Sequence, residues 1–205
     1  YSDITRELTY WLCLALCRTQ KEERFYEEVK ALDGADYWFL KGFFQRIATK
    51  YNSAENFLKK ALEISPSMQR AKRELVTALL AQHRYPEALS LAKENYERDS
   101  DNTYHMHAYF RCLVKKVNIN REDIATLKEL LDKMENSYSD KKEELHMAMN
   151  IEFQANIKRK SPDEMLDLIR NAEKNFPSSV NIQRAAHEYK LKQAIVSKEV
   201  VFPED

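Results

Sequence analysis

One short segment of the chain recurs at a fixed distance, and this recurrence limits the possible folds more than any other feature. Residues 50–54 (KYNSA) align with residues 84–88 (RYPEA), an offset of 34 residues. Around both segments, apolar residues recur with the spacing of an amphipathic helix. A period of this length holds one helix–turn–helix unit, which must stack on neighbouring units to bury its apolar face. The sequence therefore predicts an array of stacked helix pairs.

The composition agrees with an all-helical chain. The 205 residues include two glycines and five prolines, whereas sandwiches and barrels need many turns and nucleotide folds need glycine-rich phosphate loops. Helical spacing continues almost throughout, with the short breaks typical of antiparallel neighbours. Capping residues at Asn52, Asn120 and Ser161 predict helix starts. We expect an all-α fold of about five antiparallel helix pairs plus a C-terminal capping helix.

Charge and cysteine content narrow the functional classes. Lys plus Arg and Asp plus Glu number 33 each, so the formal net charge is zero and does not indicate nucleic acid or an anionic membrane as a partner. Three cysteines do not make a disulfide framework, which favours a reducing compartment. The longest apolar run, residues 10–17, is shorter than the roughly 20 residues that span a bilayer. We expect a cytoplasmic protein and, because the chain begins at Tyr1, a segment of a larger one.

Residues 35–68 carry small and large side chains at fixed positions of the 34-residue period. These residues are Trp38, Gly42, Ala54, Leu58, Ala61 and Pro66. In this pattern the segment resembles a tetratricopeptide repeat (TPR), and residues 69–102 keep part of the same pattern. The resemblance implies a right-handed superhelix whose first helices line a concave groove.

We expect a single TPR-like domain over residues 1–205. Its parts are the best repeats at 35–68 and 69–102, an irregular region at 103–140, a degenerate repeat at 146–179 and a capping helix at 180–197.

The candidate chemical groups do not form a recognisable catalytic or metal site. His105 and His107 are two residues apart, about 200° around a helix, so they cannot chelate one ion together. Cys13 and Cys17 share a helix face but lack a second pair of ligands, so we interpret them as buried small side chains. The sequence contains no pattern typical of a nucleophile turn. We therefore expect no enzyme activity, no cofactor and no metal.

The TPR resemblance also implies which side chains line the groove. Arg and aromatic residues, which are enriched at binding hot spots, predominate at these positions, and Arg pairs well with carboxylates. The groove residues are Phe39, Phe43, Arg46, Arg70, Arg73, Thr77, Tyr104, His107 and Arg111. The alternative is that the N-terminal helices bury Phe39 and Phe43 and that the arginines only solvate the inner wall.

We therefore predict a protein-interaction or regulatory scaffold that binds a peptide or helix of a partner protein, acidic and aromatic-bearing, in this groove. Two other functions are considered. The same arginines could contact phosphates in an RNA-binding helical repeat, but the neutral net charge counts against nucleic acid. The segment could also be a self-association module of a larger signalling protein, with the apolar helix at 3–18 or the last helix packing on a second copy.

Overall fold

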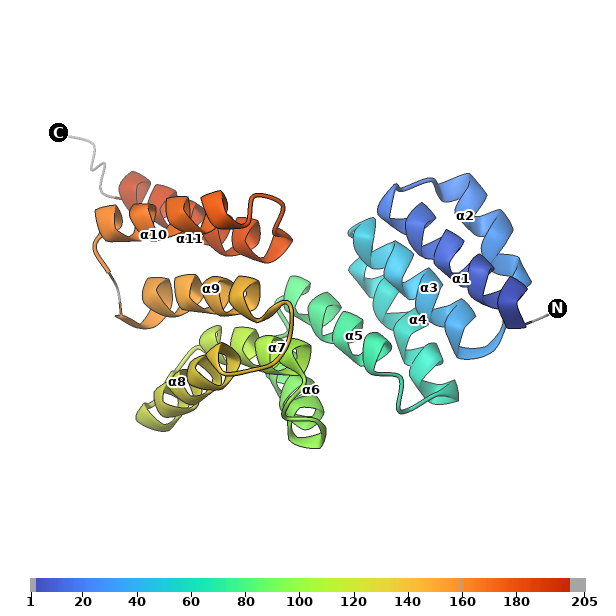
Figure 1. Cartoon of the computed structure of the whole chain (residues 1–205), viewed down its shortest axis with the longest axis horizontal. Helices are drawn as coiled ribbons and strands as arrows, with labels where there is room; N and C mark the ends of the chain where they lie inside the picture. The colour runs from blue at the N-terminus through green and yellow to red at the C-terminus, as the bar shows by residue number, and fades with distance from the viewer. Residues whose placement is uncertain (1–2, 159, 200–205) are drawn as a thin grey trace. The chain divides into compact units, whose positions relative to one another are not determined.

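A computed structural model describes residues 3–158 and 160–199. Over these residues the chain forms eleven α-helices and no β-strand, so the predicted all-α fold is confirmed. A 3₁₀ turn (Val29–Ala31) follows the second helix, and a π-helical turn (Gln154–Lys158) follows the ninth. The helices labelled in Figure 1 are α1 (Asp3–Arg18), α2 (Glu22–Glu28), α3 (Gly34–Ile47), α4 (Tyr51–Ile64), α5 (Gln69–Ala81), α6 (Tyr85–Arg98), α7 (Thr103–Val114), α8 (Arg121–Glu135), α9 (Lys142–Phe153), α10 (Pro162–Asn175) and α11 (Val180–Glu199).

The helices group into two compact units, unit 1 (Tyr1–Arg98) and unit 2 (Asp99–Asp205). Unit 1 holds the pairs α1/α2, α3/α4 and α5/α6, and unit 2 holds α7/α8, α9/α10 and the last helix, α11. The two helices of each pair lie against each other (Figure 1). Alternate helices are also in contact: α1 with α3 and α3 with α5 in unit 1, and α7 with α9 and α9 with α11 in unit 2. Within each unit the first helices of successive pairs therefore share one layer, which confirms the predicted stacking of helix pairs.

The helices α1, α3 and α5 end in the same turn. Gln20, Thr49 and His83 adopt φ values of 53°, 59° and 60° in these turns. In all three, the amide of the next residue donates to the carbonyl oxygen five residues earlier, at 2.9 to 3.1 Å. This bonding is typical of a left-handed helix cap. Thr49 and His83 are 34 residues apart, so the period found in the side chains is also present in the backbone.

Gly42 allows α3 and α4 to approach closely. A Cβ atom placed on Gly42 would lie 2.7 Å from Cγ of Leu58 on α4, a distance that real Cβ contacts essentially never show. The α4 side of the contact is also lined by small residues, because Ala54 and Ala61 are fully buried. The sequence pattern of small residues therefore marks the narrowest part of this helix pair.

Two predicted helix starts in unit 2 carry capping boxes. The Asn120 side chain accepts a hydrogen bond from the amide of Asp123 at 2.8 Å, and the Asp123 carboxylate accepts one from the amide of Asn120 at 2.9 Å. A second capping box begins α10 at Ser161. The capping prediction at Asn52 is wrong, because α4 already begins at Tyr51 and Asn52 lies inside its first turn. There the left-handed turn that ends α3 leads directly into α4, with one residue between them.

The core of unit 2 joins α9, α10 and α11. Its buried members are Ala148, Ile151, Met165, Ile169, Ala172, Ile182, Ala185, Ala186 and Tyr189. Four of the nine are alanines, so small side chains recur in this core as they do in unit 1.

Candidate functional site

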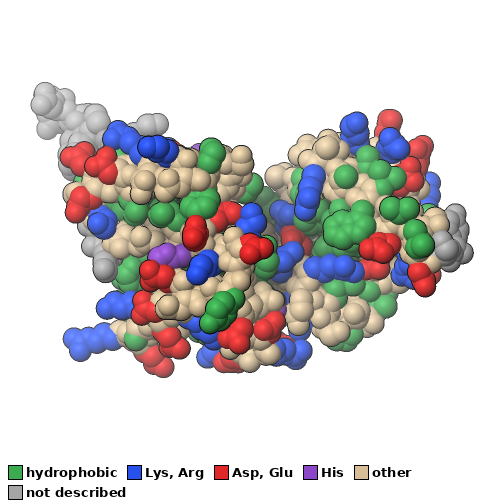
Figure 2. Space-filling model, in the orientation of Figure 1, with side chains coloured by type: hydrophobic (Ala, Val, Ile, Leu, Met, Phe, Trp, Pro, Cys, Tyr) green, Lys and Arg blue, Asp and Glu red, His purple; other side chains and the backbone are tan. Residues whose placement is uncertain are grey.

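The predicted groove residues of unit 1 lie together on the layer of first helices. Phe39 and Phe43, one turn apart on α3, stack with ring centroids 5.9 Å apart. Arg46, on the next turn of α3, lies over the Phe43 ring at 5.1 Å, and Arg70 of α5 lies over the Phe39 ring at 5.2 Å. In Figure 2, hydrophobic side chains gather on the visible face of this unit, with Lys and Arg beside them.

Helix α1 extends this surface through Tyr10. The Tyr10 ring stacks on Phe39 with centroids 6.4 Å apart, and the guanidinium of Arg70 lies 4.7 Å from the Tyr10 ring centroid. Each such cation–ring contact contributes about 0.5–1 kcal/mol at an exposed site. Burial raises the pKa of Tyr10, although the charge of Arg70 opposes this, so the hydroxyl stays protonated at neutral pH. We call the set Tyr10, Phe39, Phe43, Arg46, Arg70 and Arg73 the arginine–aromatic face.

Two carboxylates lie within the arginine–aromatic face and compensate part of its charge. Asp36 of α3 pairs with Arg70, and Glu74 of α5 pairs with Arg46. Arg73 Nε lies 3.7 Å from the same Glu74 carboxylate. Three arginines therefore share two carboxylates, which leaves this part of the surface with an excess of positive charge. The Arg70–Asp36 and Arg46–Glu74 pairs join α3 to α5, so each of these two guanidinium groups is held by a charge on the neighbouring helix.

The members of the face differ in exposure. Phe39 is 3% exposed, beneath Tyr10 and Arg70, so it supports the surface and does not itself present a ring to solvent. Phe43, Arg70 and Arg73 remain partly exposed. The Thr77 hydroxyl donates to the carbonyl oxygen of Arg73 at 3.1 Å and so turns back onto its own helix.

The three predicted groove residues of unit 2 lie on α7 and differ in environment. Tyr104 is exposed, whereas His107 is buried. The Arg111 side chain is mostly buried, with Nε 3.9 Å from Glu152 of α9, and Arg184 of α11 lies 3.1 Å from the same carboxylate. The three charged side chains form an ion network inside the first-helix layer of unit 2.

Burial controls the protonation of this network. It holds the pKa of His107 well below the usual range, and the nearby charges of Arg184 and Arg111 lower it further. Burial also lowers the pKa of Arg111 to about 10, with Arg184 as the next largest cause. His107 is therefore neutral and Arg111 charged at neutral pH. The network therefore connects the three helices α7, α9 and α11. Of the three predicted residues of unit 2, Tyr104 is the one with an exposed side chain.

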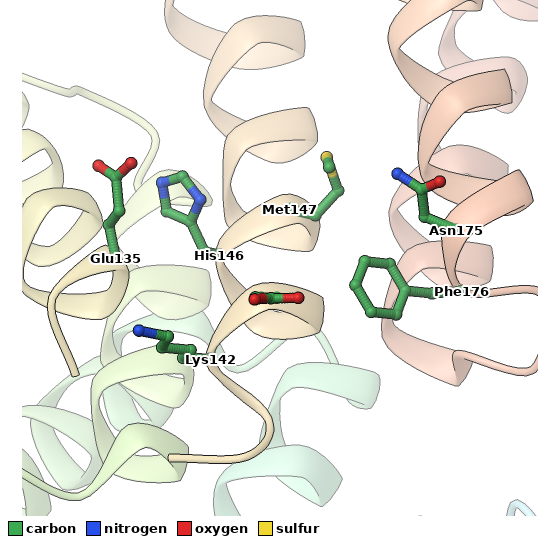
Figure 3. Close-up of a pocket in the computed structure, with 7 residues that line it drawn as sticks. Glu135, Lys142, His146, Met147, Asn175 and Phe176 are labelled. Carbon is green, nitrogen blue, oxygen red and sulfur yellow. The ribbon is translucent and has the colours of Figure 1, made fainter. Parts of the chain in front are cut away.

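A pocket of about 560 Å³ lies where α8 ends, α9 begins and α10 ends. His146 lies on the side of α9 toward Glu135, and Met147 lies on the side toward Asn175 and Phe176 (Figure 3). Met147 and Phe176 also pack against the core of unit 2, so the apolar part of the pocket wall is fixed by the fold. The predicted site does not include this pocket.

Sequence reasoning also missed the carboxylate partners and Tyr10. Asp36 and Arg70 occupy the same position of two successive repeats, 34 residues apart, so an opposite-charge comparison between repeats would have found this pair. Glu152 and Arg184 lie 41 and 73 residues from Arg111, and no local spacing joins them. Tyr10 lies before the recognisable repeats.

The described part of the chain contains no group of three or more His, Cys, Asp and Glu side chains that could hold a metal ion. None of its helices combines the length and the apolar character needed to cross a membrane.

Stacked antiparallel helix pairs whose first helices share a layer define a helical-repeat protein. Residues 46–116 match the family model of the tetratricopeptide repeat, which confirms the predicted family of the repeats. Residues 46–116 are therefore identified as tetratricopeptide repeats. Repeats of this family generally mediate protein–protein interaction and scaffolding and are typically non-catalytic. No curated protein matches the chain in sequence.

Proposed function

We propose that the arginine–aromatic face of unit 1 is the docking surface of a protein-interaction module and that it binds an acidic, aromatic-bearing peptide or helix of a partner protein. The observation that carries this proposal is the contiguity of the face. Arg70 lies over two rings, Tyr10 and Phe39, and Arg46 lies over Phe43, so charge and apolar surface alternate across three helices.

The chemistry of the face favours a partner with both carboxylates and aromatic side chains. Arg70 and Arg73 each expose about two fifths of the side chain. Each can therefore bind a carboxylate of a partner in addition to its own partner in the chain, Asp36 or Glu74. Phe43 offers a partly exposed ring on which an aromatic side chain can stack. Because Asp36 and Glu74 already lie among the arginines, a continuous phosphate backbone would meet two like charges, which favours a protein partner over RNA.

The test is selection of a random-peptide display library on the chain, followed by binding of the enriched peptides measured by fluorescence anisotropy. We expect enrichment of sequences that combine Asp or Glu with Phe, Tyr or Trp. Arg73→Gln should weaken binding about tenfold, the effect of losing one charge-assisted pair. The matched control is Arg98→Gln, which removes the same charge from the exposed face of α6 and should leave the affinity unchanged.

Phe43→Leu tests the aromatic part of the face while keeping an apolar side chain of similar volume. It should also weaken binding, with an unchanged unfolding temperature showing that the fold is intact. Peptides that bind equally well to Arg73→Gln, Phe43→Leu and the unchanged chain would contradict the proposal.

A further inference from the structure

Helix α1 exposes a line of large apolar side chains on the side away from its own unit. Ile4, Leu8 and Trp11 are 71%, 65% and 59% exposed, and they follow one another at spacings of four and three residues. Ala15 continues the same line one turn later and is also exposed. The opposite side of α1 is buried against α2 and α3.

A contiguous line of exposed large apolar side chains on one helix face is typical of an interaction surface. The four positions have the spacing of the apolar seam between two packed helices. We call Ile4, Leu8, Trp11 and Ala15 the α1 seam.

The charges beside the α1 seam indicate what covers it. Asp3 and Glu7 lie on the N-terminal half of α1 and Arg18 on the last turn, all exposed. Glu7 and Arg18 are 11 residues apart, about three helical turns, so they lie along the same edge of the seam. Among the described residues no ion pair engages any of the three. A second copy in antiparallel orientation brings the Arg18 end of one helix to the acidic end of the other, whereas parallel pairing would place like charges together.

We propose that the chain forms a two-fold symmetric dimer through antiparallel packing of two α1 helices. In the register that this orientation favours, Leu8 lies against Trp11 of the second copy, and Ile4 lies against Ala15 of the second copy. The symmetry repeats each contact twice, as in other isologous interfaces. Arg18 side chains lean toward the N-terminus of their own helix, and therefore toward the acidic residues of the second copy. The α1 seam shares no residue with the arginine–aromatic face, although the Trp11 ring contacts Tyr10 of that face with centroids 5.8 Å apart. Either proposal can therefore fail alone.

Sedimentation velocity over the micromolar range tests the dimer. The chain should show a concentration-dependent doubling of mass, and Leu8→Glu should remain monomeric at every concentration. Val117→Glu is the matched control: it places the same charge on an 89% exposed side chain between α7 and α8, and it should dimerise like the unchanged chain. A monomer at all concentrations, or a dimer that survives Leu8→Glu, would overturn the proposal.

A charge exchange tests the orientation. Glu7→Arg and Arg18→Glu should each weaken the dimer about tenfold, since two pairs are lost and two repulsions gained, and the double variant should restore the affinity. Oxidative cross-linking gives a second readout: a Leu8→Cys chain mixed with a Trp11→Cys chain should form a disulfide between the two. The three native cysteines are buried and do not compete. No rescue by the double variant, or cross-linking of Leu8→Cys chains only to themselves, would overturn the antiparallel arrangement.

Discussion

A methyl group on Gly42 would lie 2.7 Å from Cγ of Leu58, so the first and second helices of the best-conforming repeat meet where one has no side chain. Gly42→Ala should lower the free energy of unfolding by about 1–3 kcal/mol, the usual cost of overpacking a core, even though alanine is the better helix former. Urea denaturation measures this. In a Leu58→Ala background the same substitution should cost much less, because the clashing atoms are gone. An equal cost in both backgrounds would show that Leu58 is not responsible.

Thr49→Gly should stabilise the protein. Thr49 has a φ of 59°, a conformation that costs a β-branched residue energy and costs glycine almost none. The gain in the free energy of unfolding should be up to about 1 kcal/mol, because the greater freedom of glycine in the unfolded chain offsets part of it. Ala48→Gly, at the preceding residue with a φ of −74°, is the control and should destabilise. Thermal unfolding of the two variants separates the effects.

Acidification should weaken unit 2 through His107. The folded-state pKa of this histidine is depressed, so unfolding takes up a proton below the unfolded pKa of about 6.5. The neutral His107 therefore makes its full contribution to stability above that pH. As the pH falls below it, the free energy of unfolding decreases by up to about 1.4 kcal/mol per pH unit. Urea denaturation between pH 7.5 and 5, about the range in which an unfolded histidine titrates, should show this slope. His107→Gln should flatten it, and the exposed His187→Gln should not.

The three thiols should report on the two units separately. Burial raises the pKa of Cys13 to about 11 and those of Cys17 and Cys112 to about 12, so all three are protonated as well as covered at pH 8. A disulfide reagent should therefore react at least about 100-fold more slowly with the folded chain than with the unfolded one. A Cys13→Ala, Cys17→Ala variant leaves Cys112 as the probe of unit 2. Rapid stoichiometric labelling in native buffer would contradict this burial.

The fold could be predicted where local chemistry decides it. Gly42 and the buried alanines of α4 define the narrow helix pair, and the capping residues Asn120 and Ser161 mark helix starts through bonds that span three residues. The prediction at Asn52 is wrong because α4 begins two residues earlier than an Asn52 cap would place it, directly after a left-handed turn that uses main-chain bonds only.

The candidate site could be predicted only in part, because its neighbours come from distant segments. The repeat pattern names Phe39, Phe43, Arg46 and Arg70, and in the structure these residues of α3 and α5 contact one another. The pattern does not predict the burial of Arg111, which depends on a carboxylate and a second arginine from two later helices. A prediction that takes one repeat at a time assumes that each arginine can bind a partner. In the folded chain, a carboxylate on an adjacent helix can already pair with that arginine and compensate its charge.

The left-handed turns after α1, α3 and α5 have a consequence for how such a chain can change. Their bonds join main-chain atoms, so glutamine, threonine and histidine all serve at the same place. The geometry of the hairpin can therefore be inherited while nearly every surface side chain is replaced. New recognition properties can arise on such a scaffold by substitution alone, without any change of chain path.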